Sequence, residues 1–384
     1  MAGKRDGERE SVRVRAGGDM VAYLRSAERA EPESVRPTGI GDRYIWNPVA
    51  DDRRLAQSCV DLRAGLHRAA GEVLAESRGG AGRGEDGVAP GGAVPRGRVD
   101  SALRAHRSLV LAAAAADSDV AERWAAQDSG PDALLLLART AAVRALGAAD
   151  RGDWRAAKLA EIAAAACERA AAAAPGDPVP LVVELSLARL STAPATGRAA
   201  VEARVALRAA AWQLFRRIVE LDPDNREAHH RLLALHFARH GGSAAEMWQT
   251  AWWIADRVAP GSELALLPFV ALAEDARSRT AGASGDRPGD GRAGGHWSDQ
   301  DWRRAAMAVY RSWFPRVASE YRFTPVLDLS YLGHALAMGG QSEARHVLGA
   351  MGPYAAAVPW DLHGAPEAAL TEARRRLGLR VPVL

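Results

Sequence analysis

The chain has 384 residues, of which 48% are hydrophobic, so it is long enough to build two or three domain-sized cores. Its 50 basic and 47 acidic side chains nearly cancel to a net charge of +3, which argues against a strongly basic nucleic-acid-binding protein. Arginine supplies almost all the positive charge, because Lys4 and Lys158 are the only lysines. Since arginine alternates with aspartate and glutamate along the chain, we expect a solvated surface of ion pairs.

The two cysteines and the apolar runs indicate the compartment. Cys59 and Cys167 match neither a disulfide framework nor a metal-ligand spacing, and Cys167 lies in an alanine-rich run where we expect a small buried thiol. No apolar segment follows the charged first residues, as one does in a signal peptide. The apolar runs 109–116 and 133–138 are too short to span a bilayer. The sequence therefore predicts a soluble cytoplasmic protein without a membrane partner.

Composition divides the chain into six segments. Glycine-rich stretches with little apolar bulk are typical of linkers, and a charged start without helical periodicity is typical of a disordered tail. The segments are a disordered tail (1–18), an N-terminal helical segment (19–78), a glycine-rich linker (79–98), a helical repeat domain (99–276), a second glycine-rich linker (277–297) and a C-terminal helical segment (298–384).

Apolar residues that recur every three or four positions predict helices throughout, and no segment has the alternating pattern of a strand. The fold class is therefore predicted to be all-α. Asp51 or Asp52 can cap the first long helix. The preceding loop carries Tyr44, Ile45 and Trp46, which we expect to pack onto a domain. The expected helices are 19–30, 51–77, 100–127, 131–149, 153–174, 178–191, 195–221, 225–240, 243–259, 263–276, one from 298 that ends or kinks at Pro315, 325–338, 342–351 and 366–377.

Three phrases share a turn, an amphipathic run and a proline followed by a small or acidic residue. They read GDWRAAKLAEIAAAACERAAAAAPGD at 152–177, IVELDPDN at 218–225 and ARHGGSAAEMWQTAWWIADRVAPGSE at 238–263. A recurring helix–turn–helix unit implies a stacked array of helices.

The clearest case of this pattern is SYLGHALAMGGQSEA at 330–344. Its Leu332, Gly333 and Ala335 are similar to the Leu-Gly-x-Ala of the first repeat helix in the tetratricopeptide repeat superfamily. The turn at 152–154 resembles the one before a second repeat helix, and VELDPDN resembles the end of a repeat. The resemblance implies stacked antiparallel helical hairpins, a TPR-like α-solenoid with glycine-rich linkers, whose groove takes a peptide or a helix.

A histidine cluster is the densest group of titratable residues: His229, His230, His236 and His240. On a continuous helix His236 and His240 would share one face, as a pair of metal ligands does. The full HExxH pattern is absent, because Phe237, Ala238 and Arg239 lie between them. We therefore expect a groove or surface helix here, and we assign no metal, no cofactor and no catalytic residue.

The aromatic cluster Trp248, Trp252 and Trp253 is the strongest candidate for a binding site. Trp248 and Trp252 are four residues apart and should share the buried face of one helix, whereas Trp253 points about 100° away and should be partly exposed. Exposed tryptophan and arginine dominate the energetics of protein interfaces. The candidate partner-binding residues are Arg226, His230, Arg239, Trp248, Trp252 and Trp253. Their convergence on one exposed groove would favour a binding module over an enzyme.

These features favour a non-catalytic protein–protein interaction module that binds another protein or a peptide in a helical-repeat groove. Two alternatives remain open at this point. A helical enzyme would need a closed pocket that holds histidine and carboxylate groups together. An accessory transcription regulator would need a one-sided arginine face for nucleic acid, which the interspersed charges disfavour. The sequence does not define the oligomeric state.

Overall fold

The computed structural model describes residues 44–46, 49–78, 96–190, 198–282, 300–321 and 324–382. Within these ranges the regular elements are α-helices and short 3-10 helices, and β-type pairing is limited to one isolated bridge between Ile45 and Tyr354. The predicted all-α class is confirmed for this part of the chain. The expected tail 1–18 and helix 19–30 lie outside the described residues.

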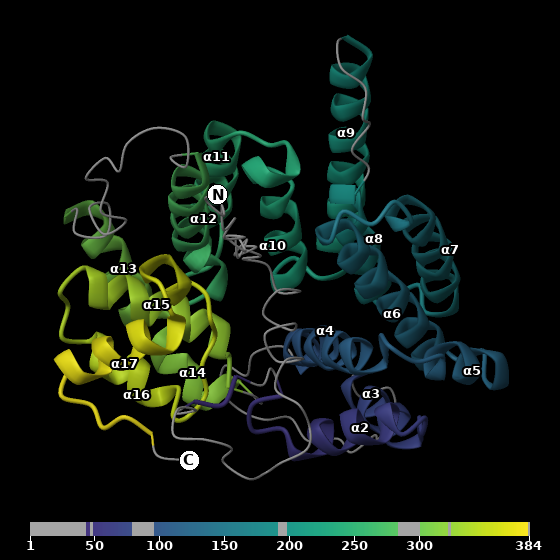
Figure 1. Cartoon of the computed structure of the whole chain (residues 1–384), viewed down its shortest axis with the longest axis horizontal. Coiled ribbons are helices and arrows are strands. Elements are labelled where there is room, and N and C mark those ends of the chain that lie inside the picture. The colour runs from purple at the N-terminus through teal and green to yellow at the C-terminus, as the bar shows by residue number, and fades with distance from the viewer. Residues whose placement is uncertain are drawn as a thin grey trace, which may run out of the picture.

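The helices lie in two groups along the chain, α2–α9 and α10–α17 (Figure 1). In this view the first group fills the right side, where α9 projects away from the other helices, and the second group fills the left side. The first group is α2 (Arg53–Arg63), α3 (Arg68–Ser77), α4 (Arg96–Ala115), α5 (Val120–Gln127), α6 (Pro131–Asp150), α7 (Ala156–Ala173), α8 (Val179–Leu187), η1 (Ala188–Leu190) and α9 (Arg198–Leu221). The second group is α10 (Arg226–Ala234), η2 (Ala238–His240), α11 (Ala244–Ala255), η3 (Glu263–Leu266), α12 (Leu267–Gly282), α13 (Gln300–Ser312), α14 (Phe314–Glu320), α15 (Val326–Met338), α16 (Ala344–Ala350), η6 (Trp360–His363) and α17 (Pro366–Arg376).

Several expected helix boundaries are wrong. The helix 51–77 is two helices, α2 and α3, because the chain turns at Gly65, whose φ of 81° suits glycine. The expected helix 100–127 is likewise divided into α4 and α5. Helix α4 begins at Arg96 and α12 runs to Gly282, so both predicted linkers lose residues to helices. Residues 79–95 and 283–299 lie outside the described part.

Two pairs of consecutive helices pack along each other. Helix α6 packs along α7, and α15 packs along α16. In the second hairpin Gly333 allows close approach, since a Cβ added there would lie 2.5 Å from the Leu348 side chain. The small residue at this position of the LGHA phrase therefore sets the separation of α15 and α16.

The two groups of helices differ in how they form a core. In α2–α9 the buried apolar side chains divide into three clusters of mainly alanine, leucine and valine, the last of which also includes residues of α10. In α10–α17 they form one larger cluster that contains the fully buried Trp313, Trp360 and Phe269. Alanine buries little apolar area, so the first group needs other contacts to fix its helices.

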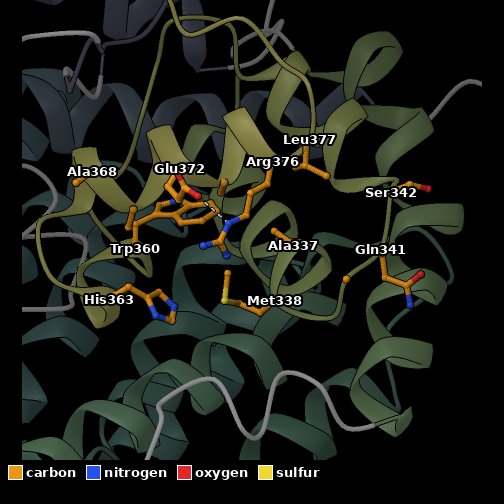
Figure 2. A pocket seen from close by; sticks show the side chains of 13 residues that line it. Ala337, Met338, Gln341, Ser342, Trp360, His363, Ala368, Glu372, Arg376 and Leu377 are labelled. Carbon is orange, nitrogen blue, oxygen red and sulfur yellow. Dashed lines mark hydrogen bonds and ion pairs between the residues drawn. The ribbon is translucent and has the colours of Figure 1, made fainter.

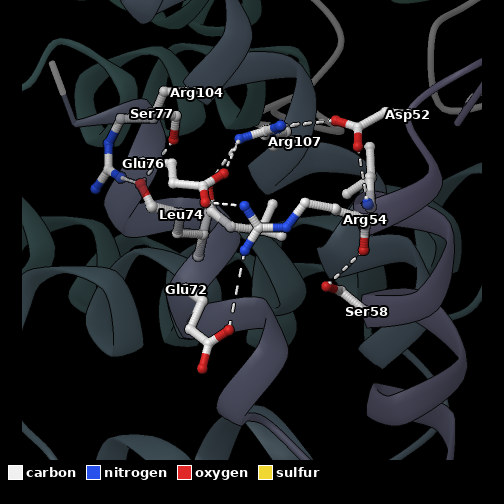
Figure 3. A network of polar contacts seen from close by, with 11 residues as sticks. Asp52, Arg54, Ser58, Glu72, Leu74, Glu76, Ser77, Arg104 and Arg107 are labelled. Atoms are coloured by element: carbon white, nitrogen blue, oxygen red, sulfur yellow. Dashed lines mark hydrogen bonds and ion pairs between the residues drawn. The ribbon is translucent and has the colours of Figure 1, made fainter.

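Buried ion pairs supply such contacts between α2, α3 and α4 (Figure 3). Arg107 on α4 donates to Asp52 Oδ2 through Nε and Nη2 at 3.0 and 2.9 Å, and to the Val73 carbonyl at 3.1 Å. Asp52 also caps α2, as expected, by accepting from the Leu55 amide at 3.0 Å. Arg104, one turn earlier, donates to the Leu74 carbonyl at 3.0 Å. Two arginines of α4 thus hold the ends of two neighbouring helices.

The aromatic loop packs down as predicted. Tyr44 is buried in the core of α10–α17, and its hydroxyl lies 3.3 Å from the Thr371 hydroxyl. The Ile45 amide donates to the Pro353 carbonyl at 2.9 Å, and the Ala355 amide donates back to the Ile45 carbonyl at 3.1 Å. The segment that precedes α2 is therefore attached to the C-terminal group of helices.

Candidate functional site

Helix α11 presents its tryptophans to two neighbouring helices. Its buried face consists of Met247, Thr250, Ala251 and Ile254. Trp248 and Trp252 lie at one edge of that face, where both rings approach Trp302 of α13 with centroid distances of 5.5 and 5.6 Å. Trp302 in turn packs against Phe269, so a single indole anchors this edge to the core.

Trp253 lies at the other edge of α11. Its ring meets Trp212 of α9 in an edge-to-face arrangement with centroids 5.6 Å apart. The Arg257 guanidinium lies 5.0 Å from the centroid of Trp253, within the range of a cation–π contact. Trp253 is 37% exposed, which confirms that it is rotated off the buried face and partly open to solvent.

The expectation of a buried Trp248/Trp252 pair is wrong for Trp252. Trp248 is half-buried, but Trp252 is 40% exposed. The narrow buried face of α11 is occupied by smaller side chains, so both indoles are displaced to its edge, and Trp302 covers only part of each. Two large indoles of α11, Trp252 and Trp253, are therefore accessible instead of one.

Helix α9 continues the apolar surface beyond α11. Its C-terminal half is anchored by the buried Ala211, Phe215 and Ile218, whereas Val201 and Val205 are 60% and 63% exposed. Val201, Val205 and Trp212 are four and seven residues apart, so they lie within about 40° of one another on the helix. We refer to Val201, Val205, Trp212, Trp252 and Trp253 as the α9–α11 surface. It follows the projecting part of α9 and reaches α11 through the contact of Trp212 with Trp253 (Figure 1).

Positive charge borders this surface. The sequence of α9 has five arginines and two glutamates, a net charge of +3 by subtraction. Arg208 of α9 forms an ion pair with Glu246 of α11, which fixes the angle between the two helices. Arg257 stacks on Trp253, and Arg204 of α9 directly precedes Val205, so cationic side chains lie next to the apolar residues of this surface.

The other predicted partner-binding residues occupy different places. Arg226 donates to both carboxylate oxygens of Asp328 on α15 at 2.8 and 2.6 Å, so it joins α10 to α15. Arg239 lies 3.5 Å from a carboxylate oxygen of Glu274 and stacks over Phe237. His230 is half-buried on α10. Arg226 and Arg239 therefore do not join the tryptophans on one exposed groove, because internal carboxylates bind both guanidiniums.

The histidine cluster does not form the expected shared face. Helix α10 ends at Ala234 and η2 begins at Ala238, so His236 and His240 do not lie on one continuous helix. The Nδ1 atoms of His229 and His240 donate to the carbonyls of Asn225 and Ala234, each at 2.8 Å. Across the described residues, no group of three or more histidine, cysteine, aspartate or glutamate side chains is arranged to hold a metal ion.

A second feature is a cavity of about 730 Å³ between the end of α15, the loop before α16, η6 and α17 (Figure 2). Trp360, Met338 and several alanines form its apolar wall, and His363, Glu372 and Arg376 supply polar groups. The Glu372 carboxylate accepts from Arg376 Nε at 2.8 Å and from Arg375 Nη1 at 2.7 Å. The carboxylate is thus already neutralised on α17.

Two imidazoles meet beside this cavity. Nε2 of His334, on α15, lies 2.8 Å from Nε2 of His363, at the end of η6. Burial lowers the pKa of both rings, and for His334 the neighbouring His363 and Arg277 lower it further. Sequence reasoning missed this pair because its members are distant in the chain and no motif surrounds them.

Sequence reasoning also missed the buried ion pairs. Arg139 of α6 donates through both terminal nitrogens to Glu227 of α10 at 2.7 and 2.5 Å, and Arg231 donates to the same carboxylate at 3.0 Å. Burial alone would raise the pKa of Glu227, but the two guanidiniums outweigh it and lower that pKa to about 2. This triad joins the two groups of helices.

No protein-family model matches this sequence, and neither a curated protein nor a solved structure matches it. Among the helices of the described part, none combines the length and the apolar character that a bilayer crossing requires.

Proposed function

We propose that this protein is an interaction module whose α9–α11 surface binds an acidic amphipathic helix of another protein. The observation that carries the proposal is the exposure of Val201 and Val205 on the face of α9 that also carries Trp212, together with the partly exposed Trp253 of α11, whose ring contacts Trp212. Contiguous exposed apolar surface of this kind marks interaction sites in soluble proteins. A partner helix with apolar residues at i, i+3, i+4 and i+7 has the matching geometry.

Charge supports an acidic partner. The net positive charge in the sequence of α9 and the cation–π pair of Arg257 with Trp253 favour a partner of negative charge. Complementary charge steers association and suppresses binding of partners with like charge. Tryptophan and arginine are also the residue types that most often contribute large shares of interface free energy.

Selection of helical peptides from a display library tests this proposal. The wild-type full chain should enrich peptides with an apolar stripe and glutamate or aspartate on the flanks. The Val205→Glu variant, which puts a negative charge on the exposed strip, should lose most of that enrichment. The matched control is Ile162→Glu, at an apolar residue of α7 that is 52% exposed against 63% for Val205, and it should behave as the wild type does. Equal enrichment on Val205→Glu, or a basic consensus, would contradict the proposal.

A second copy of this chain is the other possible occupant of the strip. Sedimentation velocity separates the cases, because self-association through α9 would give a dimer that Val205→Glu converts to a monomer. A monomeric wild type that binds selected peptides supports a different protein as the partner.

We also propose that the helical hairpins belong to a TPR-like array and that the protein works in a reducing compartment such as the cytoplasm. Support for the first comes from the Gly333–Leu348 approach in the α15–α16 hairpin, and for the second from two buried free thiols. An experimental structure tests the array, since α6–α7 and α15–α16 should both superpose on tetratricopeptide hairpins. Imaging of the tagged chain in its source cell tests the compartment, and secretion would contradict it.

A further inference from the structure

Two histidines meet next to the cavity in the C-terminal group of helices. Their Nε2 atoms lie 2.8 Å apart, so one imidazole donates its N–H to the other in the absence of an ion. His334 is fully buried, and its ring meets the Trp360 ring in an edge-to-face arrangement with centroids 4.9 Å apart. These contacts fix the position of His334. His363 belongs to the wall of the cavity and is exposed. One fixed and one adjustable nitrogen donor therefore face each other.

A third soft donor is close to this pair. Met338 follows His334 by four residues on α15, so the two side chains are neighbours on one face of the helix. Met338 and His363 line the same cavity. Figure 2 shows the Met338 sulfur and the His363 ring on the same side of that cavity, across from α17. Two imidazole nitrogens 2.8 Å apart and one thioether side chain on the same helix face as His334 thus gather at this wall of the cavity.

We propose that His334, His363 and Met338 form a binding site for a Cu(I) ion. Imidazole and thioether are ligands that suit copper, and thioether sulfur selects the soft Cu(I) state over hard or borderline cations. The site is short of ligands for zinc, which takes four donors, mostly thiolate, imidazole or carboxylate, in structural sites. No such set of three or more residues exists within the described ranges. Two or three neutral donors suffice for a monovalent soft ion.

The charges around the site favour an ion of low charge. Arg277 lies near His334 and pairs with Asp361 at 2.7 Å, so the carboxylate two residues before His363 is already neutralised. On the far side of the cavity Glu372 is neutralised by Arg375 and Arg376. A divalent ion on a neutral ligand set would lack a compensating anion here, whereas Cu(I) adds only one charge.

The site also has room for the ion. Metal–imidazole bonds of about 2 Å require the two nitrogens to separate by up to about 1 Å from their present distance. The exposed His363 ring can make this movement into the adjoining cavity while His334 stays fixed. Competition from thiols is small, because Cys59 and Cys167 are buried and burial raises the pKa of each to about 12.

Titration of the full chain with Cu(I), under anaerobic reducing conditions and in competition with a chromogenic Cu(I) chelator, tests this site. We expect one Cu(I) per chain. His363→Ala should lower the affinity at least about tenfold, because loss of a ligand should cost at least as much as loss of a residue that supports one. His346→Ala is the matched control, since His346 is an exposed histidine of the same group of helices and lies outside the cavity wall.

A second variant and a spectrum keep the test independent of folding. Met338→Leu conserves volume and removes only the sulfur, so it should weaken Cu(I) binding and remove the sulfur scatterer from the copper X-ray absorption spectrum. Absence of stoichiometric Cu(I) binding would overturn the proposal, as would equal affinities for His363→Ala and His346→Ala. A sulfur scatterer that persists in Met338→Leu would also overturn it. The site is separate from the α9–α11 surface, so either proposal can fail alone.

Discussion

The two groups of helices differ in their apolar cores, although ion pairs join helices in both groups. Helices α2–α9 have three small clusters of mainly alanine, leucine and valine, and arginines such as Arg104, Arg107 and Arg139 donate to buried acceptors between the helices. Helices α10–α17 share one core with large aromatic side chains. Small apolar side chains allow close packing but bury little area, so directional ion pairs are needed to fix which helix meets which. The comparison shows that one all-α chain can combine both solutions.

The first prediction concerns the aromatic core, where the largest effect is expected. Trp313 is fully buried, and its indole nitrogen donates to the Tyr321 hydroxyl at 2.9 Å. Trp313→Ala should lower the free energy of unfolding by about 3–5 kcal/mol, through lost burial and a cavity. Urea denaturation followed by circular dichroism measures this. The control Trp154→Ala, at an indole that is 88% exposed, should change it by less than about 0.5 kcal/mol.

The second prediction concerns the ion pairs between the two groups. Glu227→Gln leaves Arg139 and Arg231 buried without their carboxylate, so it should cost about 3 kcal/mol in unfolding free energy. The triple variant Arg139→Met/Glu227→Leu/Arg231→Met removes all three buried charges together and should cost less than Glu227→Gln alone. If the triple variant were the less stable of the two, the ion-pair triad would add net stability to the fold.

The third prediction concerns the close approach of α15 and α16. Gly333→Ala forces a methyl group against Leu348, and overpacking of this kind costs about 1–3 kcal/mol. Gly349→Ala in α16 is the matched control, because a Cβ there has no neighbour within 4 Å. That change should stabilise the helix by about 0.5–1 kcal/mol. Thermal unfolding of both variants measures the difference, and equal shifts would mean that helix separation does not depend on Gly333.

The fourth prediction concerns pH. Burial, together with the nearby Arg226, lowers the pKa of His106 from 6.5 to about 4. Between these values the unfolded chain binds a proton at His106 that the folded chain does not, so stability falls as the pH falls through this window. The effect of His106 at pH 5 is about 1–2 kcal/mol. His106→Gln should reduce the loss of stability between pH 7 and pH 5 in urea titrations. An unchanged loss would show that His106 contributes nothing to it.

Sequence periodicity predicted the helices well because apolar spacing is a local property. It placed α6 at 131–149 against the observed Pro131–Asp150, and it predicted the exposed position of Trp253. It failed where contacts between residues far apart in the sequence determine the position of a side chain. Glu227 binds Arg139, 88 residues earlier, and Trp302 reaches α11 from beyond the second glycine-rich segment. No local pattern in the sequence indicates such partners. The contact of Trp302 with α11 and the ion pair of Arg226 with Asp328 could therefore be found only in the three-dimensional structure.

Binding of an acidic helix to the α9–α11 surface is tested most directly by the Kd of a selected peptide, measured by fluorescence anisotropy, for Trp253→Ala and Trp154→Ala. Each variant removes one exposed indole, but at a different place on the surface. A difference in Kd between them therefore reflects the position of the indole and not the loss of a tryptophan as such. We expect Trp253→Ala to weaken binding by about 2 kcal/mol, roughly 30-fold, with little change in stability, and Trp154→Ala to bind as the wild type does. Equal Kd values for the two variants would contradict a binding role for this surface.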